Sequence, residues 1–382
     1  MVRVVGIDPG TRSMDVCGLE DGEVYYERVV DTAEAARNPE ALIEAVKAAE
    51  PFDLIAGPSG YGVEITYLKD IPENVVEDWY YEYILLTDKA HIEGALKKGS
   101  FGALVYYAMT NSAIEMKRRN WPVCYIPGVI QLPTVPKYRK VNRMDMGTAD
   151  KMCVAVLGVH DQARRLRIPH SEVSFIHVEM GFGYNAVLGV DEGRIVDGIG
   201  GTMMSGPGFL TISSIDAELV QIVEQWEKAD IFSGGCASIG NCSTPEELVE
   251  KINTNENCRI AYDAMIESVI KAIHSMKVTI PNPKEILISG RLTKIKEIKD
   301  ELMNRVDLAP VKKVGKLSRI KDVKETAQGY AIVCDGIAGG KFQNLIDWMK
   351  IKEAKGTSMD YIYHPKFKGF REKLVPFKQW NR

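Results

Sequence analysis

The sequence predicts an α/β protein made of two similar halves, each built around its own sheet. Runs of β-branched residues typical of strands alternate with segments of helical periodicity along the chain. A block of strands and glycine turns near the N-terminus recurs 171 residues later. With 382 residues, 45% of them hydrophobic and 26% charged, the chain is long enough for two hydrophobic cores.

The first half opens with three expected strands. VRVVGI (2–7) is a buried-strand run that Asp8-Pro9-Gly10 ends. SMDVCGLE (13–20) alternates apolar and polar residues, and an Asp-Gly turn leads to EVYYERVV (23–30). Further expected elements are a helix over 32–50, a strand with a glycine-rich loop over 53–62, a helix over 100–119, a strand over 122–131 and a helix over 146–166.

The second half begins again near residue 171. The expected elements are strands over 174–180, 184–190 and 194–199, helices over 215–229, 244–254 and 258–277, a strand over 285–290 and a helix over 325–340. The tail over 341–382 holds ten Lys or Arg against four Asp or Glu, with aromatic residues between them. We therefore expect domains over 1–170 and 171–340 and a basic, aromatic extension over 341–382, most simply a solvated tail or cap.

The repeat is specific in its residues. A shift of 171 positions aligns Gly10 with Gly181, and it aligns Asp8, the acid at the end of the first strand, with Glu179. The same shift aligns LEDGEV (19–24) with VDEGRI (190–195). Repeats outrank single motifs as evidence, so we expect two similar halves facing each other across a cleft.

The repeated turn has the chemistry of a phosphate loop. Glycine removes the Cβ that blocks close approach, so an oxyanion can sit against the N–H groups of the turn. The acids Asp8 and Glu179 are candidates for holding hydrated Mg²⁺, and for catalysis, because hard cations prefer carboxylate and water oxygens. The candidate phosphate-binding residues are Gly10, Thr11, Ser13, Gly181, Gly183 and Asn185.

Three segments carry a family resemblance. GIDPGTRSMDVCGLEDG and FIHVEMGFGYNAVLGVDEGRIVDGIGGT (which includes Gly201) resemble the two phosphate loops of the acetate and sugar kinase, Hsp70 and actin superfamily. EILISGRL resembles its adenosine motif, which assigns Ser289, Gly290 and Arg291 to the nucleotide. The order of motifs is closest to the acetate/butyrate kinase branch and resembles an archaeal family labelled predicted butyrate kinase. The resemblance implies two RNase H-like, actin-like ATPase domains, an interdomain nucleotide cleft, and the cofactors ATP and Mg²⁺.

The chain departs from that branch at the acceptor side. Glu179 stands where acetate kinases have His, and the segment before GPSGYG (57–62), which contains an arginine in acetate kinases, has none here. In place of the family's catalytic acid the chain offers RMDMGTADK, so Arg143, Asp145, Asp150 and Lys151 are candidates to act on the acceptor or the transferring phosphate. His177 shares a strand face with Glu179 by two-residue alternation, although a structural role is the simpler interpretation.

Composition limits the remaining classes. The net charge is −4 at pH 7, which predicts neither nucleic-acid nor membrane binding. The seven cysteines lack CxxC spacing, so neither a disulfide framework nor a structural zinc site is expected, and no signal peptide or membrane span is recognised. We expect a cytoplasmic protein that binds a nucleotide and a small-molecule acceptor, with a homodimer suggested by the resemblance alone.

Three functions remain open at this point. The first is an ATP-dependent kinase for a small carboxylate such as butyrate or acetate, or for a hydroxyl acceptor. The second is an ATP-binding, slowly hydrolysing regulator or chaperone-like protein without a small acceptor. The third is a RuvC-type nuclease, because GIDPG also opens that family, although such an enzyme needs more carboxylates around two metals.

Overall fold

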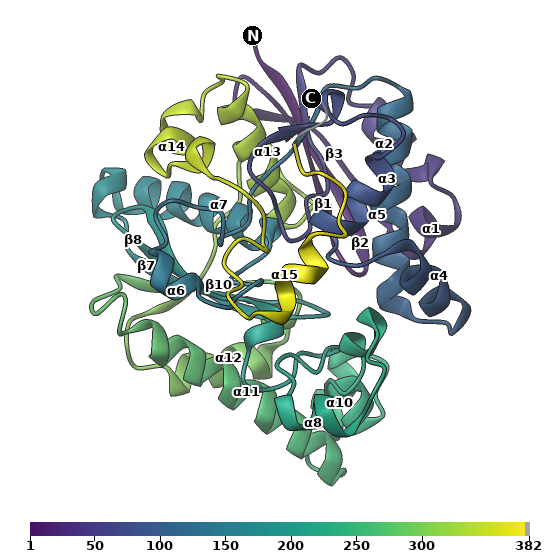
Figure 1. The fold of residues 1–382 in the computed structure, drawn as a ribbon. Coiled ribbons are helices and arrows are strands. Elements are labelled where there is room, and N and C mark those ends of the chain that lie inside the picture. The colour runs from purple at the N-terminus through teal and green to yellow at the C-terminus, as the bar shows by residue number, and fades with distance from the viewer. Residues whose placement is uncertain (379–382) are drawn as a thin grey trace.

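A computed structural model describes residues 1–378, in which two mixed sheets are separated and flanked by helices (Figure 1). The first sheet has the order β3-β2-β1-β4-β6-β5 and the second the order β11-β10-β7-β8-β9. The strands of the first sheet are β1 (Arg3–Pro9), β2 (Ser13–Glu20), β3 (Glu23–Asp31), β4 (Leu54–Ala56), β5 (Thr66–Tyr67) and β6 (Val123–Tyr125). Those of the second are β7 (Phe175–Met180), β8 (Asn185–Asp191), β9 (Arg194–Ile199), β10 (Glu285–Ser289) and β11 (Val311–Lys313).

The repeat seen in the sequence is confirmed in three dimensions. In each half an antiparallel three-stranded meander leads the sheet, and its first strand pairs in parallel with a later strand. Both second turns have positive φ at their two central residues, 47° and 75° at Asp21 and Gly22, 49° and 68° at Glu192 and Gly193. These are type I′ hairpin turns, which match the twist of the strands. The register even shifts at equivalent glycines, Gly18 and Gly189.

Helices surround the sheets. In the first half they are α1 (Thr32–Arg37), α2 (Glu40–Lys47), η1 (Leu68–Asp70), α3 (Val76–Trp79), the π-helix η2 (Tyr80–Ile84), α4 (Lys89–Lys97), α5 (Phe101–Arg118), α6 (Lys137–Lys140), α7 (Ala149–Leu166) and η3 (His170–Glu172). Then follow η4 (Gly201–Met203), α8 (Ala217–Ile222), η5 (Lys228–Phe232), α9 (Cys236–Gly240), α10 (Pro245–Lys251), α11 (Glu256–Met276), η6 (Leu292–Lys294), α12 (Lys296–Arg305), α13 (Glu325–Ile337), α14 (Gln343–Trp348), η7 (Ile351–Glu353) and α15 (Lys366–Arg371). Within the described residues, no helix combines the length and the apolar run that crossing a bilayer requires.

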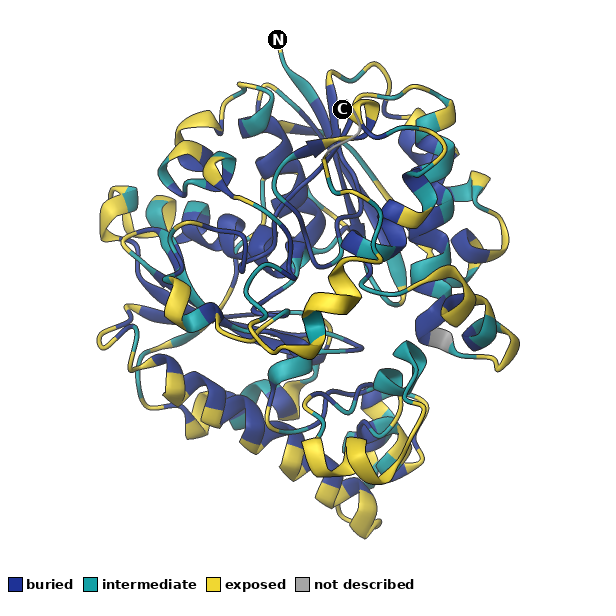
Figure 2. Ribbon diagram, viewed as in Figure 1, coloured by how far each residue is buried: buried dark blue, intermediate teal, exposed yellow. Residues whose placement is uncertain are grey.

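Three hydrophobic cores separate these layers. One lies between the two sheets and contains α7 and α13, the second covers the other face of the first sheet, and the third covers the other face of the second sheet. Successive strand residues point to opposite faces, so Val4 faces the central core and Val5 the outer one. Burial is accordingly densest in the sheets and in the two central helices (Figure 2).

The central helices fix the relation of the halves. α13 packs on β1, and Gly6 is required there because a Cβ would lie 2.3 Å from the backbone N of Ala331. α7 packs against α13 and against strands of the second sheet, with Gly158 close to the ring of Phe175. Each helix therefore starts in one half of the sequence and packs at the centre of the molecule, where both sheets meet it.

The packing of the chain differs from the boundary expected at residue 340. The helix α13 and the segment after it pack with the first sheet, because their apolar residues complete its cores. Phe377 stacks on Trp79 at 6.0 Å between ring centroids, and Tyr83 donates a hydrogen bond to the carbonyl of Val375. The described part of the extension is thus an integral cover of the first half rather than a solvated tail.

The expected helix over 215–229 was also too long. Only α8 forms, and the chain then runs on to the short 3-10 helix η5. Several apolar residues of α8 are exposed, including Ile222 at 79%. The helical periodicity of that segment therefore does not correspond to a buried face.

Candidate active site

A cavity lies where the two glycine turns meet. Its volume is about 320 Å³, and it is lined by residues of both halves. Seven carboxylates and five basic side chains line it. The acids are Asp8, Asp15, Asp145, Asp150, Glu179, Asp322 and Glu325, and the bases are Arg12, Lys151, Arg291, Lys294 and Lys324.

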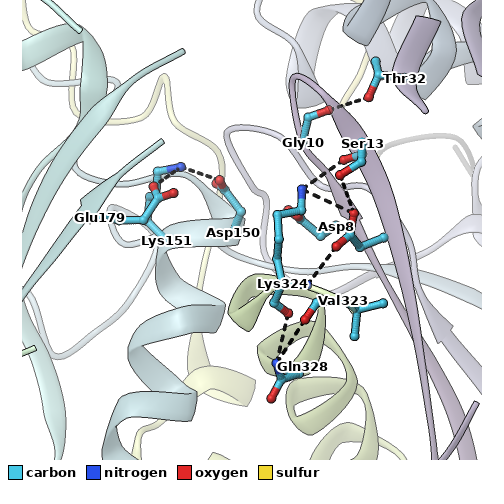
Figure 3. A network of polar contacts seen from close by, with 11 residues as sticks. Asp8, Gly10, Ser13, Thr32, Asp150, Lys151, Glu179, Val323, Lys324 and Gln328 are labelled. Carbon is cyan, nitrogen blue, oxygen red and sulfur yellow. Dashed lines mark hydrogen bonds and ion pairs between the residues drawn. The ribbon is translucent and has the colours of Figure 1, made fainter. Parts of the chain in front are cut away.

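At the first turn, the buried Asp8 carboxylate pairs with Lys324 at 2.7 Å, and Lys324 also approaches Asp15 at 3.5 Å (Figure 3). The Lys324 ammonium donates to the carbonyl of Ser13, 2.9 Å away, and its backbone N–H donates to Asp15. Burial raises the pKa of Asp8, and Lys324 offsets part of that rise. Burial alone lowers the pKa of Lys324, but the charges of Asp8 and Asp15 outweigh it and the net shift is upward.

At the second turn, Glu179 pairs with Lys151 at 2.5 Å, and Lys151 also bridges to Asp150 (Figure 3). The hydroxyl of Thr148 donates a hydrogen bond to Asp150. Burial raises the pKa of Glu179, partly offset by Lys151. For Asp150 burial also acts upward, but the charge of Lys151 and the hydrogen bonds prevail, so its pKa is lowered.

These two ion pairs cross between the halves. Lys151 stands in the first half of the sequence and pairs with the acid of the second half, whereas Lys324 stands in the second and pairs with the acid of the first. Both lysines sit at helix starts, Lys151 in the first turn of α7 and Lys324 at the N-cap of α13. The N-terminal ends of two long helices thus open on one cavity, where backbone dipoles favour anions.

The two turns almost touch across the cavity. A Cβ on Gly183 would lie 3.2 Å from the hydroxyl oxygen of Thr11. Hydrogen bonds among the described residues do not use the backbone N–H groups of Gly10, Thr11 and Arg12. Such turns are suited to receive phosphate oxygens from both sides.

The segment identified with the adenosine motif borders the same cavity. Ser289 ends β10 and Gly290 follows it, with φ of 91° and the backbone of Met180 packed against its α-carbon. Arg291 lies over the ring of Phe182 at 5.6 Å, and Arg12 from the first turn lies over that ring at 5.0 Å. Arg12, Phe182 and Arg291 therefore connect the two glycine turns to the position expected for the nucleoside.

His177 shares the strand face of Glu179, as expected, and its Nε2 lies 2.9 Å from the hydroxyl oxygen of Ser289. Burial, followed by the charge of Lys151, lowers the pKa of His177 to about 3. His177 is therefore neutral at ordinary pH, and its contact with Ser289 is a hydrogen bond between uncharged groups that orients the Ser289 side chain next to Gly290.

The remaining predicted residues divide into two groups. Asp145 lines the cavity and its oxygens accept hydrogen bonds from the N–H groups of Gly147 and Thr202 and from the hydroxyl of Thr202, with Gly201 beside it. Arg143 is exposed, lies outside the cavity lining and contacts Met203, so the structure gives no place for it at a transferring phosphate. Asn185 is buried without a hydrogen-bond partner for its amide among residues 1–378, and it too does not line the cavity.

The far end of the cavity is apolar and was not predicted. Three tyrosines, Tyr61, Tyr106 and Tyr184, border it together with Phe232. Burial raises the pKa of each tyrosine, and at Tyr61 and Tyr184 the Tyr106 hydroxyl adds to the effect. Lys228 donates a hydrogen bond to the Tyr61 hydroxyl oxygen, 2.9 Å away, and lies over the Tyr61 ring.

The residues fit a nucleotide with its divalent cation. The lining carries more carboxylates than basic groups, so a triphosphate needs a cation to enter. No cluster of three metal-ligating side chains occurs in the described part of the chain, and Asp8 and Glu179 each hold a lysine. That arrangement suits Mg²⁺, which keeps its waters and binds through one or two carboxylates plus phosphate oxygens.

Sequence reasoning named Lys151 but not its pairing with Glu179, and it overlooked Lys324, although a signal existed. Lys151 moved by the repeat offset falls at position 322, two residues before Lys324. If the repeat had been extended from the strands to the helices, it would have indicated that Lys151 and Lys324 occupy equivalent places in the two halves. Lys228 had no such signal, because only the folding of 226–232 across the cavity brings it to Tyr61.

Comparisons with solved structures agree with this architecture. The chain is similar to a propionate kinase of Francisella tularensis (TM-score 0.56, 10% identity, 86% of this chain and 99% of that one). It is similar to the acetate kinases of Porphyromonas gingivalis (TM-score 0.54, 12% identity, 86% and 98%) and Entamoeba histolytica (TM-score 0.52, 11% identity, 79% and 86%). At such identities the likeness establishes the fold, which is the two-domain, actin-like ATPase fold of these kinases.

Sequence comparisons place the chain more narrowly. It is 24% identical to the UPF0285 protein MJ1370 of Methanocaldococcus jannaschii over 360 residues, which cover 88% of this chain and 96% of that protein. The label predicted butyrate kinase is not among these findings and stays a prediction. Residues 6–364 match a family described as "Protein of unknown function (DUF1464)", and the chain belongs to that family.

Proposed function

We propose that this protein is a phosphotransferase that moves the γ-phosphoryl group of Mg·ATP onto a small acceptor bound between its two halves. The observation that carries the proposal is the pair of facing glycine turns, each with a buried acid, a lysine and a helix N-terminus at one cavity. Phosphoryl transfer depends mainly on positioning and on neutralising the charge of the transferred group. A cavity built from two phosphate-binding turns supplies both.

Each residue has a specific part in this scheme. The N–H groups of the first turn and the hydroxyls of Thr11 and Ser13 would bind phosphate oxygens, as would the turn around Gly183. Lys324 and Lys151 are held at the turns by their acids and would donate from their ammonium groups to the phosphates. Asp8 and Glu179 would position Mg²⁺ through its waters, and Mg²⁺ when bound supplies further neutralisation of the transferred charge.

At the nucleoside end, Ser289, Gly290 and Arg291 would seat the adenosine. Gly290 allows the backbone to turn away from Met180 with positive φ, which leaves space above the strand end. The resemblance to acetate and butyrate kinases favours a short carboxylic acid as acceptor, and a hydroxyl acceptor is the other option.

A second candidate function is an ATP-binding regulator that hydrolyses slowly and has no small acceptor. The exposed position of Arg143 favours the regulator, because Arg143 lies away from the cavity. Within the described chain, the arginines that line the cavity are Arg12 and Arg291, and both contact Phe182 rather than the acceptor end. The nuclease alternative receives no comparable support, because the four acids at the turns are paired with lysines.

Turnover of Mg·ATP with and without short carboxylic acids separates the two candidates. For the kinase we expect ADP formation that depends on the added acid, and an acyl phosphate that hydroxylamine traps as a hydroxamate. Slow ADP formation that no carboxylate or hydroxyl acceptor accelerates would favour the regulator. Asp8→Asn is the matched variant, expected to lower the rate at least tenfold while removing only one charge.

A further inference from the structure

The apolar end of the cavity has the composition of a subsite for a second ligand. Its wall is formed by Ile84 and Leu85, which end the π-helix, and by Val105 and Met109 on α5. Phe232 faces this wall from the second half, with its ring 5.8 Å from those of Tyr106 and Tyr184. Nothing in the proposed binding of ATP uses these side chains.

Hydrogen-bond donors converge on that wall. Because Lys228 donates to the oxygen of Tyr61, the hydroxyl proton of Tyr61 is left for another acceptor, either the nearby Tyr106 hydroxyl or a ligand. The hydroxyl of Tyr184 is buried and makes no well-formed hydrogen bond with the described residues, although the Tyr106 hydroxyl is close by. A buried hydroxyl without a partner is costly, and one that lines a cavity indicates a polar ligand atom there.

The charge at this end is positive and uncompensated. Within residues 1–378, no carboxylate lies within 4.0 Å of the Lys228 ammonium, which is held by the ring faces of Tyr61 and Tyr106 and by the Tyr61 hydroxyl. Burial lowers the pKa of Lys228 to about 8, with Asp145 acting in the opposite direction. Asp145 itself is already engaged by Gly147 and Thr202. An anionic ligand would supply the missing counter-charge.

We propose that this end of the cavity is the acceptor subsite, and that it takes a carboxylate whose apolar body is larger than a methyl group. The carboxylate accepts from the hydroxyls of Tyr61 and Tyr184, while Lys228 positions and polarises Tyr61. The aliphatic and aromatic wall takes the body of the acid. The inference rests on the proposed function and narrows its acceptor.

Lys228 reaches the subsite from the other half of the molecule. The segment 226–232 crosses to the first half, where Glu227 pairs with Lys98 at 2.9 Å and Phe232 packs against Gly102. The subsite is therefore complete only when the two halves are together, which couples acceptor binding to closure of the cavity.

The test is calorimetric titration of acetate, butyrate and hexanoate into the full chain saturated with Mg²⁺ and a non-hydrolysable ATP analogue. We expect butyrate or hexanoate to bind at least tenfold more tightly than acetate. Lys228→Met and Tyr184→Phe should each weaken that binding at least tenfold, and Lys228→Arg should restore most of it, with nucleotide affinity unchanged in all three. Lys98→Met is the matched control, because it breaks an ion pair of the same segment without touching the tyrosines.

The outcomes separate the two claims. Equal carboxylate binding by wild type and Lys228→Met would overturn the inference, as would an equal loss in Lys98→Met, which would mean that docking of the segment is all that matters. Binding of the nucleotide without any of the three acids would overturn the subsite and leave the proposed function standing. Failure of the nucleotide itself to bind would overturn both.

Discussion

The two glycine turns are equivalent by sequence, yet their charges are held differently. At the first turn Lys324 serves Asp8 closely and Asp15 more distantly, and its side chain is 31% exposed. At the second turn Lys151 serves Asp150 and Glu179 at short distance and is only 11% exposed. The acids show the opposite order: the Asp8 and Asp15 side chains are 4% and 1% exposed, against 23% for Asp150 and 8% for Glu179. The first turn therefore buries its acids more deeply, and it should lose more stability when its cation is removed.

The first prediction concerns the loss of stability when each of the two lysines is replaced in turn. Lys324→Met leaves the buried carboxylates of Asp8 and Asp15 without a counter-charge, so we expect the free energy of unfolding to fall by about 3–5 kcal/mol. Lys151→Met should cost less, because the Asp150 side chain is 23% exposed and keeps part of its hydration. Urea denaturation of both variants measures the difference, with Lys89→Met on the surface as a control that should behave as wild type.

The same pair has a pH signature. Without Lys151 the buried carboxyls take up protons more readily, so the defect of Lys151→Met should shrink when the titration is repeated at pH 5 instead of pH 7. Equal losses from the two lysine variants, or a defect that does not depend on pH, would contradict the asymmetry.

A second difference lies two residues before the acids, where the first half has Gly6 and the second has His177. Because the folded-state pKa of His177 is about 3, below the ordinary 6.5, the unfolded chain binds a proton that the folded chain rejects. His177 should therefore cost stability progressively as pH falls from 6.5 toward 3, by about 1.4 kcal/mol per pH unit at most. Unfolding of His177→Asn between pH 7 and pH 4 should show a shallower loss than wild type; an identical slope would refute this account.

The third prediction concerns the contact between the turns. A methyl group at Gly183 would press on the Thr11 hydroxyl across the phosphate position. We expect Gly183→Ala to weaken binding of Mg·ATP about tenfold, or about 1.4 kcal/mol, with little change in unfolding. Fluorescence titration with a labelled ATP analogue measures it, and Gly94→Ala on α4, where a Cβ meets nothing, is the control.

The smallest expected effect is the pH dependence of acceptor binding. Lys228 faces the hydroxyl of Tyr61, the rings of Tyr61 and Tyr106 and, more distantly, Asp145, and its pKa is about 8. Its positive charge is present below that pH and is lost above it, so carboxylate affinity should fall several-fold between pH 7 and pH 9. The tyrosines do not titrate in this range because their pKa values are raised. A carboxylate affinity that does not change between pH 7 and pH 9 would contradict a role for Lys228 in acceptor binding.

The strands and turns could be predicted because their signals are local. Period-two alternation, Asp-Gly turns and a fixed offset of 171 residues located both meanders, including the equivalent acids Asp8 and Glu179. Most of the predicted phosphate-loop residues line one cavity.

What sequence reasoning missed depends on packing between distant segments. The pairing of Lys324 with Asp8 spans most of the chain, and the cover formed by Phe377 on Trp79 joins residues about as far apart. The helix predicted over 215–229 is shorter in the structure, where only α8 forms. The chain after α8 crosses the cavity instead of continuing as a helix, and this places Lys228 beside Tyr61. Periodicity describes one face of a segment and contains no information about which partner covers it.

The central claim is that both turns grip the phosphates of one nucleotide. A crystal structure of the chain with Mg²⁺ and a non-hydrolysable ATP analogue tests it most directly. We predict phosphate oxygens in contact with both the Gly10 turn and the Gly181–Gly183 turn, with the adenosine beside Gly290 and the ammonium groups of Lys151 and Lys324 turned toward the phosphates. Phosphates that lie away from both turns would contradict the account.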